Sequence, residues 1–226
     1  MRYLIANWKA QMTFTEIVDW LGVFNHFVDS NSHLKKQLHE QLTIVICPPF
    51  PFILYVREHL NNLPNIKVGA QNISTVKRGK FTGEVTAYAL KDICDFVIVG
   101  HSERRSNFNE SEEDIALKIS RADQYNIQAI HCIRDERDMI YDNAKIIAFE
   151  PVEAIGTGEN ANPKTVTELK TKLNLADDVM FLYGGSADST NIHDYLNTGQ
   201  IDGFLVGTAS LYPKEFYAMA SHMVSS

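Results

Sequence analysis

Residues able to move a proton or hold an anion lie just after short apolar runs at five places in the chain. In chain order these residues are Asn7 and Lys9, His101, Glu150, Gly184-Gly185-Ser186, and Gly207. A carboxylate can act as a general base, an imidazole can polarise a carbonyl, and an ammonium group can stabilise a developing negative charge. Glycine turns let backbone amides approach an oxyanion closely. If the fold brings these positions together, the set favours proton-transfer chemistry on an anionic substrate.

The apolar runs that precede these residues belong to a set of eight spread along the chain. Each has four or five residues, is rich in Val, Ile, Leu, Phe or Tyr, and lacks polar alternation. The runs are Tyr3–Ala6, Thr43–Cys47, Lys67–Ala70, Phe96–Val99, Ile127–Ile130, Ile146–Phe149, Val179–Tyr183 and Gly203–Val206. This pattern is typical of strands buried on both faces, as in a parallel sheet.

Amphipathic stretches of helical spacing lie between most of these runs. A capping box, Thr13-x-x-Glu16, precedes an apolar stripe formed by Ile17, Val18, Leu21, Phe24 and Val28. A second helix is expected after Ser111-x-x-Asp114, and a third after the cap Asn162-Pro163. Further helices are expected at Phe52–Leu60, Thr86–Lys91, Ser189–Leu196 and Lys214–Val224.

Eight strand–helix units in 226 residues average about 28 residues each, which is the size of a βα repeat. The sequence therefore predicts an α/β protein with one domain over residues 1–226, a (β/α)8 barrel whose strands end at a common rim. An open, doubly wound sheet is the structural alternative. That fold normally carries a glycine-rich phosphate turn after its first strand, and Asn7-Trp8-Lys9 is not one.

The composition excludes several classes of protein. Hydrophobic residues make up 45% and charged residues 22%, which is typical of a folded globular chain. The formal net charge of −7 disfavours nucleic acid or an anionic membrane surface as a partner. No apolar run reaches the roughly 18–20 residues of a membrane span, and the start of the chain lacks a signal-peptide core. Because the three cysteines lack metal or redox spacing, we expect a reduced, cytoplasmic protein.

Several motifs give the chain a resemblance to the triosephosphate isomerase family. They are Asn7-Trp8-Lys9, residues 100–105 (GHSERR), Glu150-Pro151-Val152 with residues 154–158 (AIGTG), residues 183–186 (YGGS) and residues 202–207 (DGFLVG). Residues 69–72 (GAQN) and 81–84 (FTGE) also match, and all of these matches run in family order. The resemblance implies an isomerase of glycolysis and gluconeogenesis that interconverts dihydroxyacetone phosphate and D-glyceraldehyde 3-phosphate through an enediolate. It implies no cofactor and no metal ion.

The resemblance also implies roles for the polar residues of the rim. Glu150 would be the base that moves the proton, and His101 would polarise the substrate carbonyl as a neutral imidazole. The ring would be neutral because Ser102 is expected to begin a short helix whose positive end disfavours an imidazolium. Lys9 would stabilise the enediolate and the phosphate, and Asn7 would orient Lys9 and donate a hydrogen bond.

Four further positions are implied to hold the substrate phosphate, namely Gly156, Ser186, Gly207 and Thr208. Gly156 belongs to an expected mobile lid, Pro151–Ala161, which would exclude water from the enediolate. Two residues depart from the family pattern here. Glu153 stands where the family usually has tryptophan at the lid hinge, and Thr208 replaces a glycine of the phosphate turn.

Supporting contacts and the assembly follow from the same resemblance. Glu103 is expected to pair with Lys9 or a neighbouring backbone group, and Arg104 with Glu84. Ser74–Gly79 resembles a loop that reaches into a second subunit, with Thr75 near its tip helping to position Lys9 across the interface. A homodimer is therefore the expected assembly.

The connection between the fifth and sixth strands is the part of the chain that departs most from the family. Arg134-Asp135 stands where the family usually has Gly-Glu, and the segment Cys132–Ile146 is short. Such a segment holds a helix of at most about two or three turns. We expect a turn or two at this place, which would leave the barrel thinly covered.

Other functions remain open on the sequence alone. The chain could be another phosphosugar barrel, either an epimerase or a Schiff-base aldolase, although Lys145 lies at the wrong end of its strand for the latter. It could also be a degenerate barrel that senses a phosphate ligand without catalysis. His131 follows the fifth run, so a two-histidine metal site with His101 is a further possibility, against which His131 is most simply a buried strand residue.

Overall fold

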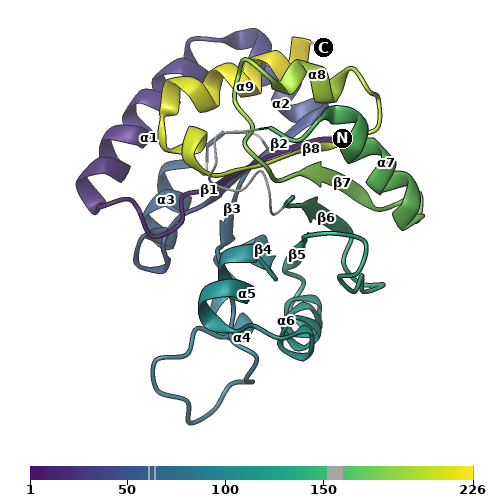
Figure 1. The fold of residues 1–226 in the computed structure, drawn as a ribbon. Helices are drawn as coiled ribbons and strands as arrows, with labels where there is room; N and C mark the ends of the chain where they lie inside the picture. Colours follow the sequence, from purple (N-terminus) through teal and green to yellow (C-terminus); the bar gives the residue numbers. More distant parts are fainter. Residues whose placement is uncertain (61, 64, 152–159, 226) are drawn as a thin grey trace.

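A computed structural model describes residues 1–60, 62–63, 65–151 and 160–225. Its strands form a closed, all-parallel barrel in chain order (Figure 1). The strands are β1 (Arg2–Asn7), β2 (Leu42–Cys47), β3 (Ile66–Ala70), β4 (Phe96–Val99), β5 (Gln128–Ile133), β6 (Ile146–Phe149), β7 (Met180–Tyr183) and β8 (Gly203–Val206). Each strand coincides with an apolar run within a few residues, so the barrel is confirmed and the open sheet is excluded. Closure is direct, because β1 pairs with both β2 and β8.

Side chains from alternate strand positions fill the inside of the barrel. This inner cluster consists of Ile5, Val45, Cys47, Phe96, Ile98, Ile130, Cys132, Ile146, Ala148, Leu182 and Leu205. Strand β3 contributes Gly69 at this level, and a β-carbon there would lie 2.6 Å from the Sγ of Cys47. The barrel is thus a packed core rather than a pore, and its chemistry is confined to the rim.

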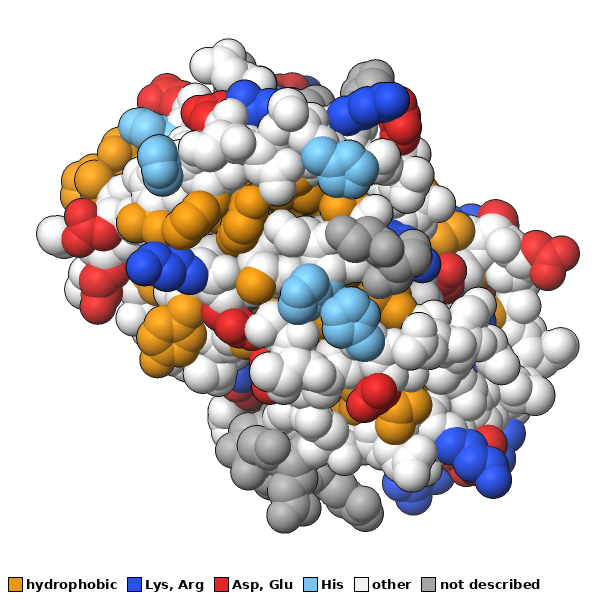
Figure 2. Space-filling model, turned by 90° about the horizontal axis from the view of Figure 1, so that it is seen from above, with side chains coloured by type: hydrophobic (Ala, Val, Ile, Leu, Met, Phe, Trp, Pro, Cys, Tyr) orange, Lys and Arg blue, Asp and Glu red, His pale blue; other side chains and the backbone are white. Residues whose placement is uncertain are grey.

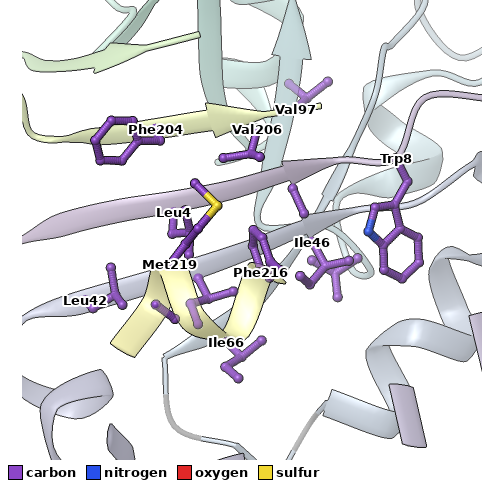
Figure 3. Packing of buried hydrophobic residues seen from close by; sticks show 14 of the residues in the cluster. Leu4, Trp8, Leu42, Ile46, Ile66, Val97, Phe204, Val206, Phe216 and Met219 are labelled. Atoms are coloured by element: carbon purple, nitrogen blue, oxygen red, sulfur yellow. The ribbon is translucent and has the colours of Figure 1, made fainter. Parts of the chain in front are cut away.

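Helices surround most of the barrel. They are α1 (Phe14–Asp29), α2 (Ser32–Glu40), α3 (Ile53–Leu60), α4 (Ala87–Leu90), α5 (Ser102–Phe108), α6 (Glu112–Gln124), α7 (Pro163–Leu173), α8 (Ile192–Leu196) and α9 (Pro213–Ser225), with 3-10 turns η1 (Phe50–Phe52) and η3 (Thr208–Leu211). Phe216 and Met219 of α9 are fully buried and point toward strand residues such as Leu4 and Ile46 (Figure 3).

The local signals predicted most helix starts correctly. Both capping boxes form, at Thr13 for α1 and at Ser111 for α6, and Asn162 caps α7. The stripe on α1 needs one correction, because Trp20 is buried whereas Val18 is exposed. Helix α2 was not predicted, since only two apolar residues four positions apart mark its buried face.

The connection from β5 to β6 contains only turns and bends over residues 134–145 (Figure 1). The expected shortening is therefore confirmed. Asp138 holds the segment together by accepting hydrogen bonds from Arg134, through its backbone nitrogen at 2.7 Å, Nε at 3.0 Å and Nη2 at 2.7 Å. His131 of β5 lies beneath the segment and is fully buried. This agrees with the expectation that His131 is a buried strand residue.

The loop between β3 and α4 extends away from the barrel at the bottom of Figure 1. Its neck is closed by a hydrogen bond from the nitrogen of Ser74 to the carbonyl oxygen of Val85, at 2.8 Å. Thr75 is the next residue, and its carbonyl oxygen accepts a hydrogen bond from Arg121 of α6. Thr75 therefore lies at the neck of the loop and not near its tip, which corrects the expectation from sequence.

Among the described helices, none is long and apolar enough to cross a membrane. Figure 2 looks down from above the view of Figure 1. On that face the described Lys and Arg side chains are scattered among Asp and Glu, and they do not gather into one patch.

Candidate active site

Lys9 follows β1 in a left-handed backbone conformation, with φ of 51°. Such a conformation costs free energy for a residue with a β-carbon, so neighbouring groups must hold it. Asn7 Oδ1 accepts a hydrogen bond from the Lys9 nitrogen at 3.1 Å. Gln71 Nε2 donates to the carbonyl oxygens of Lys9, at 2.8 Å, and Cys47, at 2.9 Å. The backbone of Lys9 is thus fixed from both sides.

His101 directly precedes helix α5, as the sequence predicted from Ser102. Its Nδ1 accepts a hydrogen bond from the backbone nitrogen of Glu103 at 3.2 Å, so His101 is itself the helix cap. Since Nδ1 accepts, the ring proton belongs on Nε2. The side chain is buried and presents Nε2 to the Oε1 of Glu150, 2.9 Å away.

Glu150 follows β6, and its side chain is only 2% exposed. Besides the contact with His101, its Oε2 accepts a hydrogen bond from the backbone nitrogen of Ser102 at 2.8 Å. The Cβ of an alanine at Gly184 would lie 3.0 Å from its Cγ, so this glycine leaves room for the carboxylate. The candidate base and the candidate electrophile are therefore in direct contact, although 48 residues separate Ser102 from Glu150 in the chain.

The protonation of His101 reflects opposing effects. Burial lowers its pKa, but the charge and hydrogen bond of Glu150, together with the charge of Glu103, raise the pKa by more, so the net shift is upward. The expectation of a neutral ring stays a prediction, and the hydrogen bond that Nδ1 accepts from Glu103 is compatible with it.

Two charged residues of the His101 segment were expected to make ion pairs. The Lys9 Nζ lies 2.6 Å from Glu103 Oε1, which confirms the first expectation. The second is wrong: Arg104 forms its ion pair with the buried Glu110, while Glu84 accepts a hydrogen bond from Ser74. Glu110 is only six residues further along the chain and lies within hydrogen-bond reach of the Arg104 guanidinium.

Gly207, one of the positions expected to hold a phosphate, lies next to Lys9. A β-carbon at Gly207 would be 3.5 Å from Lys9 Nζ, so the backbone of this turn is adjacent to the ammonium group. Thr208 is exposed and begins η3, and Ser186 is half-buried after β7. Gly156 and Glu153 lie outside the described residues.

The end of the expected lid is anchored on the barrel. Tyr183 Oη accepts a hydrogen bond from the Ala161 nitrogen at 3.0 Å, and Tyr195 Oη donates to the Ala161 carbonyl oxygen at 2.6 Å. Residues 152–159, which make up most of that segment, lie outside the described part of the chain.

Three supporting residues were not found from the sequence. Gln71 follows β3, so the rule that site residues follow strands could have identified it. The other two, Glu110 and Lys118, form a buried ion pair at 2.8 Å that also reaches Asn72. Burial lowers the pKa of Lys118, and Glu110 opposes that shift. No local signal marks this pair, because helix α6 places Lys118 under a segment distant in sequence.

No group of three or more His, Cys, Asp or Glu side chains is placed to hold a metal ion in the part of the chain that the structure describes. His131 lies between Ile130 and Cys132, which both belong to the inner cluster, so its ring faces outward from the barrel. It therefore does not join His101 at the rim. Lys145 precedes β6 and pairs with Asp178 at 2.8 Å, away from the rim, as the sequence indicated.

Comparison with known proteins agrees with this geometry. The family model described as Triosephosphate isomerase matches residues 2–144 and 140–223, and the two matches meet inside the β5–β6 connection. Triosephosphate isomerase of Aquifex aeolicus is 36% identical over 95% of this chain and 96% of that protein. Those of Dictyoglomus thermophilum (35%, covering 96% and 97%) and Mesomycoplasma hyopneumoniae (32%, covering 95% and 96%) are similar. The chain belongs to the triosephosphate isomerase family.

Proposed function

We propose that Glu150, His101 and Lys9 carry out the isomerisation of triose phosphates, the activity of the family to which the chain belongs. The observation that carries this proposal is the 2.9 Å contact between Glu150 Oε1 and His101 Nε2 at the rim of the barrel. A substrate carbonyl placed between the two side chains would separate them. Such a substrate meets a base on one side and an N–H donor on the other.

Each group has a defined step in this proposal. Glu150 takes a proton from the carbon next to the carbonyl, and the Nε2–H of His101 stabilises the oxygen as negative charge develops on it. Glu150 then returns the proton to the neighbouring carbon, while His101 passes the hydroxyl proton of the first carbon to the oxygen of the second. Together these transfers convert dihydroxyacetone phosphate to D-glyceraldehyde 3-phosphate through the enediolate. Lys9, oriented by Asn7 and paired with Glu103, supplies a fixed positive charge beside both the enediolate and the phosphate.

The phosphate is assigned to the backbone turns beside Lys9. Gly207 supports this assignment by its closeness to Lys9 Nζ, and Ser186 and Thr208 follow the two neighbouring strands β7 and β8. Loops after the last two strands are the usual phosphate site of this fold. Gly156 would complete the site from the lid. No cofactor or metal ion takes part in these steps.

We further propose the assembly and the cellular place of the protein. Residues 1–226 form one domain, a view supported by the pairing of β1 with β8. The loop after β3, which extends away from the barrel, supports a homodimer. The buried, free cysteines among the described residues support a cytoplasmic location.

The substitution Glu150→Gln tests the proposal. It keeps the shape of the side chain but removes the base, so kcat should fall by roughly 10²–10⁴-fold. Affinity for a phosphate-bearing substrate analogue should be unchanged, as measured by calorimetry. Glu113→Gln, an exposed carboxylate on α6, is the matched control and should retain full activity. Near-native turnover of Glu150→Gln in a coupled assay would refute the assignment.

A further inference from the structure

Gly100, the residue that precedes His101, is held by charged side chains at both of its backbone polar groups. The Gly100 nitrogen donates a hydrogen bond to Glu110 Oε1 at 3.2 Å, and the Gly100 carbonyl oxygen accepts one from Arg105 Nε at 2.8 Å. Gly100 has φ of +75°. Because glycine has no side chain to restrict its backbone, these two hydrogen bonds are needed to hold it in one conformation. The position of the His101 ring therefore depends on Arg105.

Arg105 is itself held in place by groups from three elements. Its side chain is 4% exposed, its Nη2 lies 3.4 Å from the carbonyl oxygen of Cys132 on β5, and its Nη1 pairs with Glu112 of α6. Asp138, from the β5–β6 connection, places Oδ2 3.8 Å from Nη2. Arg105 thus joins the end of β4 to the end of β5 under the candidate site.

The two carboxylates around Arg105 are not equivalent. The side chain of Glu112 is 35% exposed, whereas that of Asp138 is 6% exposed and lies under the connection. Attraction between charges is screened much less when both are buried. Without the charge of Asp138, the guanidinium would be drawn toward Glu112 and away from the Gly100 carbonyl.

Asp138 takes its position because the connection between β5 and β6 forms turns in place of a helix. The connection folds back on itself because Arg134 donates three hydrogen bonds to the Asp138 carboxylate. Those bonds leave the carboxylate facing inward toward Arg105. A helix over this short segment would not deliver an acidic side chain to that point by the same hydrogen bonds.

We infer that Asp138 is a positioning residue for His101, acting through Arg105 and the carbonyl of Gly100. The inference rests on the proposed role of His101 in the isomerisation. It assigns to the short β5–β6 connection a part in catalysis, because the connection carries the charge that keeps Arg105 under the His101 segment.

The test compares Asp138→Asn with Asp135→Asn. Asp135 lies on the same connection and loses the same charge, but it pairs only with the exposed Arg137 in the described part of the chain. Because a small displacement of a catalytic group can cost up to about a hundredfold, Asp138→Asn should lower kcat by roughly tenfold. KM should change little, since the groups that bind the phosphate lie elsewhere.

A second readout reports on His101 without any turnover. The ¹⁵N resonances of the His101 ring should shift in Asp138→Asn and stay at the wild-type position in Asp135→Asn. Asp138→Glu restores the charge and should recover most of the lost kcat. If Asp138→Asn does not fold, Arg134→Lys takes its place with the same readouts, because it loosens the hold on Asp138 at a half-exposed position.

The outcomes separate this inference from the proposed function. Equal kcat and equal His101 resonances for the variant and the Asp135→Asn control would overturn the positioning role. A wild-type protein without isomerase activity would instead overturn the proposed function, while the resonance shift in Asp138→Asn would still support the link between Asp138 and His101.

Discussion

The substitution His131→Leu should make the protein more stable and reduce its sensitivity to acid. His131 is fully buried, and neither ring nitrogen has a hydrogen-bond partner among the described residues. An unsatisfied buried polar atom costs roughly 1–3 kcal/mol, whereas leucine has none and differs from histidine modestly in volume. After an allowance for imperfect packing, we expect a gain of about 1–2 kcal/mol near pH 7.

The pH dependence follows from the groups that face His131. Burial lowers its pKa to about 4, from 6.5, and Arg105 adds to this shift while Asp138 opposes it. Tyr141, whose ring centroid lies 5.4 Å away, covers it from the connection. Between the two pKa values the unfolded chain binds a proton that the folded chain does not. Stability of the wild type should therefore fall as the pH drops through this window, by about 3 kcal/mol in total.

Urea unfolding, followed by circular dichroism, measures the free energy of unfolding of the variant and the wild type. The measurement is made at fixed protein concentration and in steps of roughly half a pH unit. The gap between His131→Leu and the wild type should widen by about 1.2 kcal/mol per pH unit near pH 5. His33→Leu, at an exposed position of α2, is the control and should follow the wild-type curve. A gap that is constant with pH, or a less stable variant near pH 7, would refute the reasoning.

Two other outcomes are expected. Gln71→Leu removes the hydrogen bonds from Nε2 to the carbonyl oxygens of Lys9 and Cys47, so kcat/KM should fall roughly 10–100-fold in steady-state assays. An unchanged value would show that Asn7 alone suffices to hold Lys9. Sedimentation equilibrium should find a dimer for the wild type, because the loop after β3 extends away from the barrel. A fully active wild-type monomer would contradict the proposed assembly.

The strands and the helix starts could be predicted because their signals are local. Buried parallel strands need continuous apolar runs, and capping side chains such as Thr13 and Ser111 act on backbone groups three residues away. Helix α2 was not predicted because the burial of its apolar face depends on packing against α1, α9 and β2, which the local sequence does not reveal. The exposure of Val18 has the same cause, since the direction of the α1 stripe is set by packing against α9.

In the candidate site too, local sequence identified the main residues but not all of their contacts. Glu150, His101 and Lys9 could be named because the end of a parallel strand places a side chain at the rim whatever the rest of the chain does. The partners of those residues could not be named correctly in every case. Arg104 pairs with Glu110 and not with Glu84, because the chain turns between α5 and α6 and brings Glu110 beside the guanidinium.

By itself, the sequence determined the number of βα units, the order of the rim residues and the shortness of the β5–β6 connection. These follow from chain length, hydrophobic pattern and spacing, which are properties of the chain before it folds. Only the tertiary structure decided that Glu150 contacts His101, that His101 has a raised pKa, and that Asp138 lies beside Arg105. Such contacts depend on distances and burial between elements far apart in sequence, and charges interact strongly only after folding removes the water between them.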